Sequence, residues 1–122
     1  MTRVRFLTLL AIVLLISVHA QGCSDPIRVE TIRVSLQNGE IYQFPTVGGD
    51  EEGARISTAP KHYNISEIRR NAATKWVATF VYQPAAGFVG SDYAEIETLT
   101  GSDGASAPTN VRRVAFQFGI HN

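Results

Sequence analysis

Cysteine and leucine are both scarce in this chain. Cys23 is the only cysteine among 122 residues, so the chain cannot form an internal disulfide. After residue 22 only Leu36 and Leu99 remain, against eight valines and eight isoleucines. Such a bias toward β-branched residues favours strands over helices. The sequence therefore predicts a small β-rich domain that is held together without disulfides.

A long apolar run and an excess of positive charge are also lacking. The run from Phe6 to Val18 has 13 residues, whereas a membrane-spanning helix needs about 20. The formal net charge is zero, and setting Arg3 and Arg5 aside leaves nine basic and eleven acidic residues. These properties argue against a protein with several membrane spans and against a nucleic-acid-binding surface.

The first 22 residues have the features of an export signal. Arg3 and Arg5 form a short basic region, the apolar run follows it, and small residues precede Cys23. This order is typical of a secretory signal peptide. We therefore expect residues 1–22 to be a signal peptide with a helical apolar part. Residues 23–122 are expected to form one domain, because a chain of this length suits a single core.

Cys23 directly follows this segment. Residues 20–23, Ala-Gln-Gly-Cys, resemble the lipobox of bacterial lipoproteins, although Ala20 and His19 differ from its usual residues. The resemblance implies lipid attachment at Cys23 and a membrane anchor. Ser24, in place of an aspartate, resembles the pattern that permits transfer to the outer membrane. The alternative is cleavage after Ala20, which would release a periplasmic or secreted protein with a free thiol.

Alternating apolar residues and turn signals divide residues 23–122 into short segments. We expect strands at residues 27–36, 40–44, 55–57, 74–82, 93–100 and 111–120. Asn38 and Gly39 are typical of a tight hairpin turn, so the first two strands are expected to pair. Six or seven short strands predict an all-β fold of two packed sheets.

Three of these segments carry more detailed predictions. Residues 111–120 should form a half-buried strand, because apolar residues alternate with others at Val114, Phe116, Phe118 and Ile120. Residues 74–82 have apolar side chains on both faces and are expected to be a central strand, with one face formed by Trp76, Ala78, Phe80 and Tyr82. Residues 64–73 are expected to form one or two helical turns. Asn64 and Glu67 fit a variant of the capping box. Ile65, Ile68 and Ala72 would lie on one face of a helix.

The most distinctive motif lies between residues 80 and 92. It has the form Tyr-x-Pro-x-x-Gly-Phe-x-Gly-x-Asp, and its fixed positions are Tyr82, Pro84, Gly87, Phe88, Gly90 and Asp92. This motif resembles a signature of bacterial immunoglobulin-like and cadherin-like domains, and with its flanking strands the resemblance covers residues 76–120. The resemblance implies an immunoglobulin-like antiparallel β-sandwich of about seven strands. Ala94 and Ile96 stand where that family usually has aromatic residues.

The residue types of the motif favour structural roles. Pro84 removes a backbone donor and should end a strand, and Gly87 and Gly90 permit unusual backbone angles. Phe88 is expected to plug one end of the sandwich, and Asp92 can accept hydrogen bonds from turn amides. The motif is therefore interpreted as part of the fold, with no catalytic role.

Candidate catalytic and metal-binding residues are few. His62 and His121 lack a third ligand at a spacing typical of zinc sites, and the acids at residues 50–52 lack the pattern of a calcium loop. Glu95 and Glu97 share one strand face, where both are expected to face solvent beside Tyr93. Paired carboxylates can hydrolyse glycosidic bonds, so a small hydrolase using them is one alternative. We expect no cofactor and no enzymatic activity.

The favoured function is a non-catalytic binding or structural module of the bacterial cell envelope, anchored as a lipoprotein. Its partner would be an envelope protein or a polysaccharide. The basic doublets at residues 69–70 and 112–113 are expected to protect sheet edges, and contact with anionic lipid or polysaccharide is an alternative. A second alternative is a soluble secreted interaction or inhibitor protein, with its specificity in the loops at residues 45–53 and 101–110.

Lipid attachment at Cys23 can be tested by metabolic labelling with a clickable fatty acid. The wild-type protein should carry the label, and Cys23→Ala should lose it, because the thiol is the acceptor. Absence of label from the wild type, or equal label in the variant, would contradict the lipoprotein hypothesis.

Overall fold

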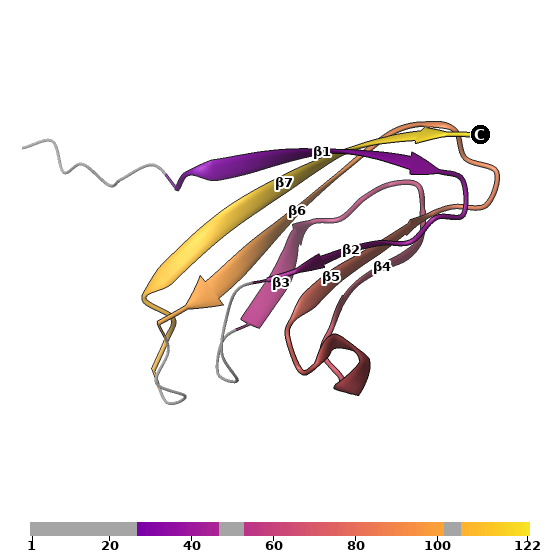
Figure 1. The fold of residues 1–122 in the computed structure, drawn as a ribbon. Coiled ribbons are helices and arrows are strands. Elements are labelled where there is room, and N and C mark those ends of the chain that lie inside the picture. The colour runs from indigo at the N-terminus through magenta and orange to yellow at the C-terminus, as the bar shows by residue number, and fades with distance from the viewer. Residues whose placement is uncertain (1–26, 47–52, 102–105) are drawn as a thin grey trace, which may run out of the picture.

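The computed structural model describes residues 27–46, 53–101 and 106–122. They form seven strands and one short 3-10 helix in two packed sheets (Figure 1). The elements are β1 (Val29–Gln37), β2 (Tyr42–Pro45), β3 (Gly53–Thr58), β4 (Tyr63–Arg69), η1 (Ala72–Thr74), β5 (Thr79–Pro84), β6 (Gly90–Thr100) and β7 (Asn110–His121). The prediction of an all-β sandwich with about seven strands is confirmed.

The predicted signal peptide and Cys23 lie outside the described residues. So do the acids at residues 50–52. Within the part of the chain that the structure describes, no helix has the length and apolar character needed to cross a membrane.

The two sheets have a strand order related to that of immunoglobulin domains. The first, sheet A, has the order β1-β7-β6-β3, and the second, sheet B, has the order β2-β5-β4. In constant-type immunoglobulin domains the first strand belongs to the sheet of the second, fourth and fifth strands. Here β1 lies instead beside β7 and runs parallel to it, while the other strand pairs are antiparallel. The central position predicted for the strand at residues 74–82 is confirmed, since β5 lies between β2 and β4.

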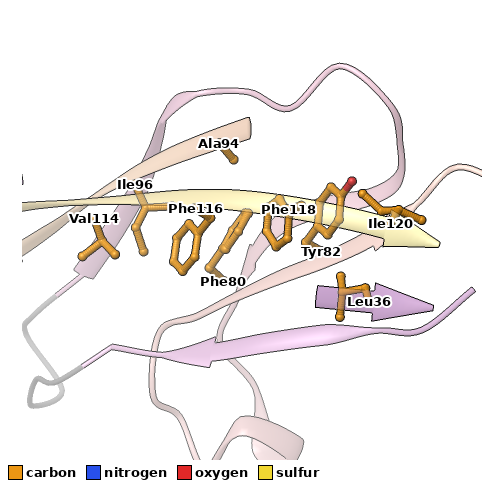
Figure 2. Close-up of a cluster of buried hydrophobic side chains, with 9 residues drawn as sticks. All are labelled: Leu36, Phe80, Tyr82, Ala94, Ile96, Val114, Phe116, Phe118 and Ile120. Atoms are coloured by element: carbon orange, nitrogen blue, oxygen red, sulfur yellow. The ribbon is translucent and has the colours of Figure 1, made fainter. Parts of the chain in front are cut away.

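Aromatic side chains from β5 and β7 form the centre of the core between the sheets (Figure 2). The ring of Phe80 stacks on that of Phe116 at 5.0 Å between centroids, and Tyr82 stacks on Phe118 at 3.9 Å. The surrounding buried apolar residues are Leu36, Ala94, Ile96, Val114 and Ile120. The predicted inner face of residues 111–120 is therefore confirmed, because alternate side chains of β7 point into this core.

The predicted hairpin of the first two strands is wrong. Gly39 adopts the left-handed backbone that the Asn-Gly turn requires, with φ of 85°, but β1 and β2 lie in different sheets. The reason is that Asn38 bonds to the β5–β6 loop. Its side chain donates to the carbonyl of Phe88 at 2.8 Å and accepts from the amide of Gly87 at 3.2 Å. The turn therefore carries the chain from one sheet to the other.

The predicted helical turns at residues 64–73 are also wrong, because most of this segment is β4. A β-bulge between Tyr63 and Ile65 inserts an extra residue into the pairing with β5. After the bulge the register is regular, with Ile65 opposite Gln83 and Ile68 opposite Phe80. These two isoleucines therefore lie on opposite faces of β4, and their spacing of three residues only resembles a helical face. The capping box lies later, at Asn71 just before η1, and the Asn71 side chain accepts from the amide of Thr74.

The strand predicted at residues 74–82 begins only at Thr79, so the expectation that Trp76 shares a strand face with Phe80 and Tyr82 is wrong. Lys75 and Trp76 have left-handed backbones, with φ of 52° and 62°. The amide of Trp76 donates to the carbonyl of Asn71 at 2.9 Å, which closes the turn of η1 before the strand starts. Trp76 is consequently 60% exposed.

The stability lost when an aromatic residue of the core is truncated to alanine should increase with the burial of that residue. Phe116 is fully buried, so Phe116→Ala should lower the free energy of unfolding by about 3 to 5 kcal/mol. Phe88 only packs against the edge of the core and is partly buried, so Phe88→Ala should cost less, roughly 1 to 3 kcal/mol. Denaturant melts of the two variants and the wild type measure both values, and the reverse order would contradict this description of the core.

Candidate functional site

The carboxylate of Asp92 is the most extensively bonded charged group among the described residues. Oδ1 accepts from the amide of Lys61, and Oδ2 accepts from the amide of His62 and the hydroxyl of Tyr82, each at 2.9 Å. The amide of Tyr93 also donates to Oδ1 at 2.9 Å. These donors belong to β5, β6 and the β3–β4 connection, so one side chain joins both sheets.

These hydrogen bonds decide the protonation of the group. Burial by itself would raise the pKa of Asp92, but the amides of Lys61, His62 and Tyr93 and the Tyr82 hydroxyl outweigh burial and lower the pKa. Burial, together with the bond to Asp92, raises the pKa of Tyr82. Asp92 is therefore a structural anion whose lone pairs are occupied.

The other motif residues form the loop beside this carboxylate. Tyr82 and the buried Pro84 belong to β5, and Gly87 has a left-handed backbone with φ of 78°. The ring of Phe88 stacks on the imidazole of His62 at 4.1 Å. Gly90, with φ of 140°, lies under this ring, and a Cβ there would approach the ring within 3.3 Å. The motif thus packs the loop against the β3–β4 connection.

Glu95 and Glu97 share the outer face of sheet A, but the expectation that both face solvent is wrong. Glu97 is buried between two arginines, bonding to Arg55 Nε at 2.6 Å and to Arg113 Nη2 at 2.9 Å. These bonds, led by that from Arg113, lower the pKa of Glu97. Glu95 accepts hydrogen bonds from the hydroxyls of Tyr93 and Thr58. The bond to Glu95 raises the pKa of Tyr93.

A groove of about 880 Å³ crosses the outer face of sheet A at the ends of β1 and β7. We call it the outer groove. The register places Ser35 of β1 and Ser91 of β6 on either side of Gly119 of β7. The three residues of this row have only hydroxymethyl groups or a hydrogen atom as side chains, so the row forms a depression between larger neighbours. In the next row, Arg33 and Tyr93 flank Gln117.

One wall of the outer groove is the β3–β4 connection. β3 ends at Thr58, opposite Glu95, so the first part of β6 has no strand on that side. The chain continues through Ala59, Lys61 and His62, which line the groove together with Asp92. Since the Asp92 carboxylate holds the amides of this wall, the wall has a fixed position.

Positive side chains lie on both sides of the outer groove. Arg33 lies on the β1 side, where its Nε donates to Gln117 Oε1 at 3.4 Å, and Lys61 lies on the opposite wall. None of the ion pairs formed between described residues involves either of them. The lining side chains include two cations, Arg33 and Lys61, and one anion, the hydrogen-bonded Asp92, so their formal charge is positive by one.

Metal ligands do not gather in the described ranges. No group of three or more His, Cys, Asp or Glu side chains suited to a metal ion occurs among residues 27–46, 53–101 and 106–122. His62 and His121 are exposed, as expected, and come from different elements. His121 Nδ1 lies 3.4 Å from Ser35 Oγ, beside the outer groove.

The turn around η1 is a second exposed feature, at the opposite end of the sandwich. The Asn71 and Thr74 side chains bond to each other's backbone amides. Arg70 Nε donates to the carbonyl of Trp76 at 2.7 Å. These bonds hold two consecutive left-handed residues, Lys75 and Trp76, a conformation that costs of order 1 to 3 kcal/mol each. Such strain in a rigid, exposed turn is a feature that clusters at functional sites.

Sequence reasoning missed both exposed features. The groove combines residues from β1, β6, β7 and the β3–β4 connection, which are brought together by strand pairing over long sequence separations. One signal was present, since Gly119 lies inside the last strand, on the face opposite its alternating apolar residues. A glycine inside a strand often marks close approach of a ligand or another backbone.

Comparisons with known proteins assign no family. No family model and no curated protein matches the chain, and nine chains of solved structures do. A cysteine protease inhibitor from Entamoeba histolytica aligns with 76% of this chain and 95% of its own, at 9% identity and a TM-score of 0.41. A sialyltransferase from Photobacterium damsela aligns with 76% of this chain and 18% of its own, at 9% identity and a TM-score of 0.39. Both TM-scores are below 0.5, so neither likeness carries a functional argument.

Removal of the Asp92 charge should change stability and its pH dependence. Because the folded state lowers the pKa of Asp92 below its ordinary 3.8, its contribution is present above that value and is lost as the pH falls through the folded-state pKa. Asp92→Asn should lower the free energy of unfolding at neutral pH by about 2 to 4 kcal/mol. This variant should also lose less stability than the wild type when the pH is lowered.

Tyr82→Phe is the matched control, since it removes one donor and keeps the carboxylate. It should cost roughly 1.5 to 3 kcal/mol and retain the acid dependence, to which Glu97 also contributes. Denaturant melts from pH 2 to pH 7 compare the three proteins. An unchanged acid dependence in Asp92→Asn would contradict the structural role of this carboxylate.

Proposed function

We propose that this chain is a non-catalytic binding module of the bacterial cell envelope, exported by residues 1–22 and anchored by lipid at Cys23. The observation that carries the proposal is the outer groove, which is about 880 Å³ and has a rigid wall. Its volume lies within the range of roughly 300 to 1,000 Å³ typical of ligand sites. The groove combines an exposed aromatic ring, hydroxyl and amide side chains, and cations on both sides.

The environment of the two glutamates supports binding over hydrolysis. A glycosidase of the two-carboxylate type needs a general acid whose pKa is raised, so that it is protonated at neutral pH. Two arginines lower the pKa of Glu97 instead. The Tyr93 and Thr58 hydroxyls bond to Glu95. Both carboxylates are therefore used in contacts between neighbouring strands.

The position of the groove also suits an anchored module. Cys23 precedes Ile27 by four residues, which reach at most about 14 Å when fully extended. Val29 pairs with Arg113 near the start of β7, whereas Ser35 pairs with Gly119 near its end. A lipid at Cys23 would thus hold at the membrane the end of the sandwich where β1 begins. The outer groove would lie toward the opposite end.

Trp76 favours a second candidate function, that of a secreted interaction protein. It is 60% exposed, on a turn fixed by several hydrogen bonds, and tryptophan is enriched among residues that dominate the energy of protein interfaces. The turn lies at the same end of the sandwich as the end of β2 and the end of β6, where the loops at residues 45–53 and 101–110 begin (Figure 1). A partner protein bound there would contact Trp76 first.

Photo-crosslinking in the native host separates these functions. The crosslinking amino acid p-benzoylphenylalanine replaces Tyr93 in the outer groove, Trp76 in the turn, or Gln43, an exposed control on sheet B. A groove ligand should give envelope adducts from position 93 that exceed those from position 43. Adducts from position 76 alone would favour the interaction protein.

A hydrolase screen provides the complementary control. Glu95→Gln/Glu97→Gln should behave as the wild type, because no reaction is proposed. An activity of the wild type that is lost in this variant would overturn the non-catalytic assignment.

A further inference from the structure

We propose that the outer groove binds an acidic oligosaccharide, a sugar chain that carries carboxylate or sulfate groups. This inference rests on the proposed function as a binding module and adds the chemical class of the ligand. It is carried by the shape of the groove floor, the exposed tyrosine and the charge of the two walls.

The floor of the groove can accept a flat ring. The row of Ser35, Gly119 and Ser91 projects little above the backbone, and Tyr93 stands beside it with 40% of its surface exposed. The hydroxyl of Tyr93 donates to Glu95, which restrains the orientation of the aromatic ring. The C–H bonds on one face of a pyranose form a positively polarised apolar surface, which complements the negative face of an aromatic ring.

Side chains that bond to hydroxyl groups surround this ring. Ser35, Ser91 and Gln117 each offer both donors and acceptors toward the groove. A sugar presents the same mixture at every ring carbon that carries a hydroxyl. An apolar peptide segment would leave these polar groups without partners, and this loss costs binding energy.

The charge of the walls selects an anion. Arg33 and Lys61 lie on opposite sides of the groove. Two carboxylates are near: Asp92 is buried with four donors, and Glu95 at the rim interacts with Tyr93, Thr58 and the charge of Arg113. The outer groove therefore presents cations whose anionic partner would come from the ligand.

Both cations are of a type that bonds to anionic groups. Arginine matches a carboxylate or sulfate through paired N–H donors, and lysine acts as a point charge. Since the two lie on opposite walls, an acidic group at either end of a short chain would meet one of them. A neutral sugar would use only Tyr93 and the hydroxyl-binding side chains.

Titration calorimetry with defined oligomers tests the proposal on the full exported domain. The probes are oligogalacturonate, sulfated dextran oligomers, neutral dextran oligomers and polyglutamate. One of the two acidic sugars should bind, and neutral dextran should bind at least about tenfold more weakly, a difference typical of losing charge-assisted hydrogen bonds. Salt at about 0.5 M should weaken the binding, because exposed charges are screened.

Two double variants with the same change of net charge locate the binding. Arg33→Gln/Lys61→Gln should weaken binding of the acidic sugar about tenfold or more. Arg28→Gln/Lys75→Gln, which removes two exposed cations outside the groove, should leave it unchanged. Tyr93→Leu should weaken binding of acidic and neutral sugars alike, and thermal melts establish that each variant is folded.

Three outcomes would overturn this inference. They are no binding of either acidic sugar, equal weakening by the two double variants, and tighter binding of polyglutamate, which would indicate an acidic peptide ligand. If envelope adducts still form at position 93 in such a case, the binding module stands and only the ligand class is wrong.

Discussion

The buried carboxylate of Asp92 is the contact on which the arrangement of both sheets depends. It lies at the start of β6 in sheet A and accepts from the Tyr82 hydroxyl of sheet B and from two amides of the β3–β4 connection. A buried carboxylate is stable only when its lone pairs are satisfied, so the donors and the carboxylate require one another. The stacking of Tyr82 on Phe118 links this polar cluster to the aromatic core shown in Figure 2.

The same contact shapes the surface of the protein. β3 ends at Thr58, and the chain crosses to sheet B through residues held at Lys61 and His62. The crossing segment becomes a wall of the outer groove, because it runs beside the part of β6 that β3 leaves uncovered. A motif whose residues have structural roles therefore creates the site where a ligand would bind, without contributing a reactive group.

The sequence predicted most strands and failed where either a local turn or a contact with distant residues overrides the pattern. The alternation in residues 111–120 was sufficient to predict the inner face of β7, because a strand with one face on the core buries every second side chain. Three failures have specific causes: the pairing of residues 63–69 with β5, the turn that exposes Trp76, and the bonds that tie Asn38 to the β5–β6 loop. The burial of Glu97 was missed because its partners, Arg55 and Arg113, belong to two other strands.

The sequence by itself determined the class of fold, since β-branched residues, alternation and turn residues act within a few positions of one another. It also indicated that Asp92 can accept hydrogen bonds from turn amides, but the donors Lys61 and His62 were decided by the tertiary structure, because they lie 31 and 30 residues away in the chain. Only the tertiary structure decided that β1 pairs with β7, that two arginines hold Glu97, and that Arg33, Tyr93 and Lys61 line one groove. These outcomes depend on strand pairing between residues far apart in the chain, and such pairing is set by the packing of the whole sandwich.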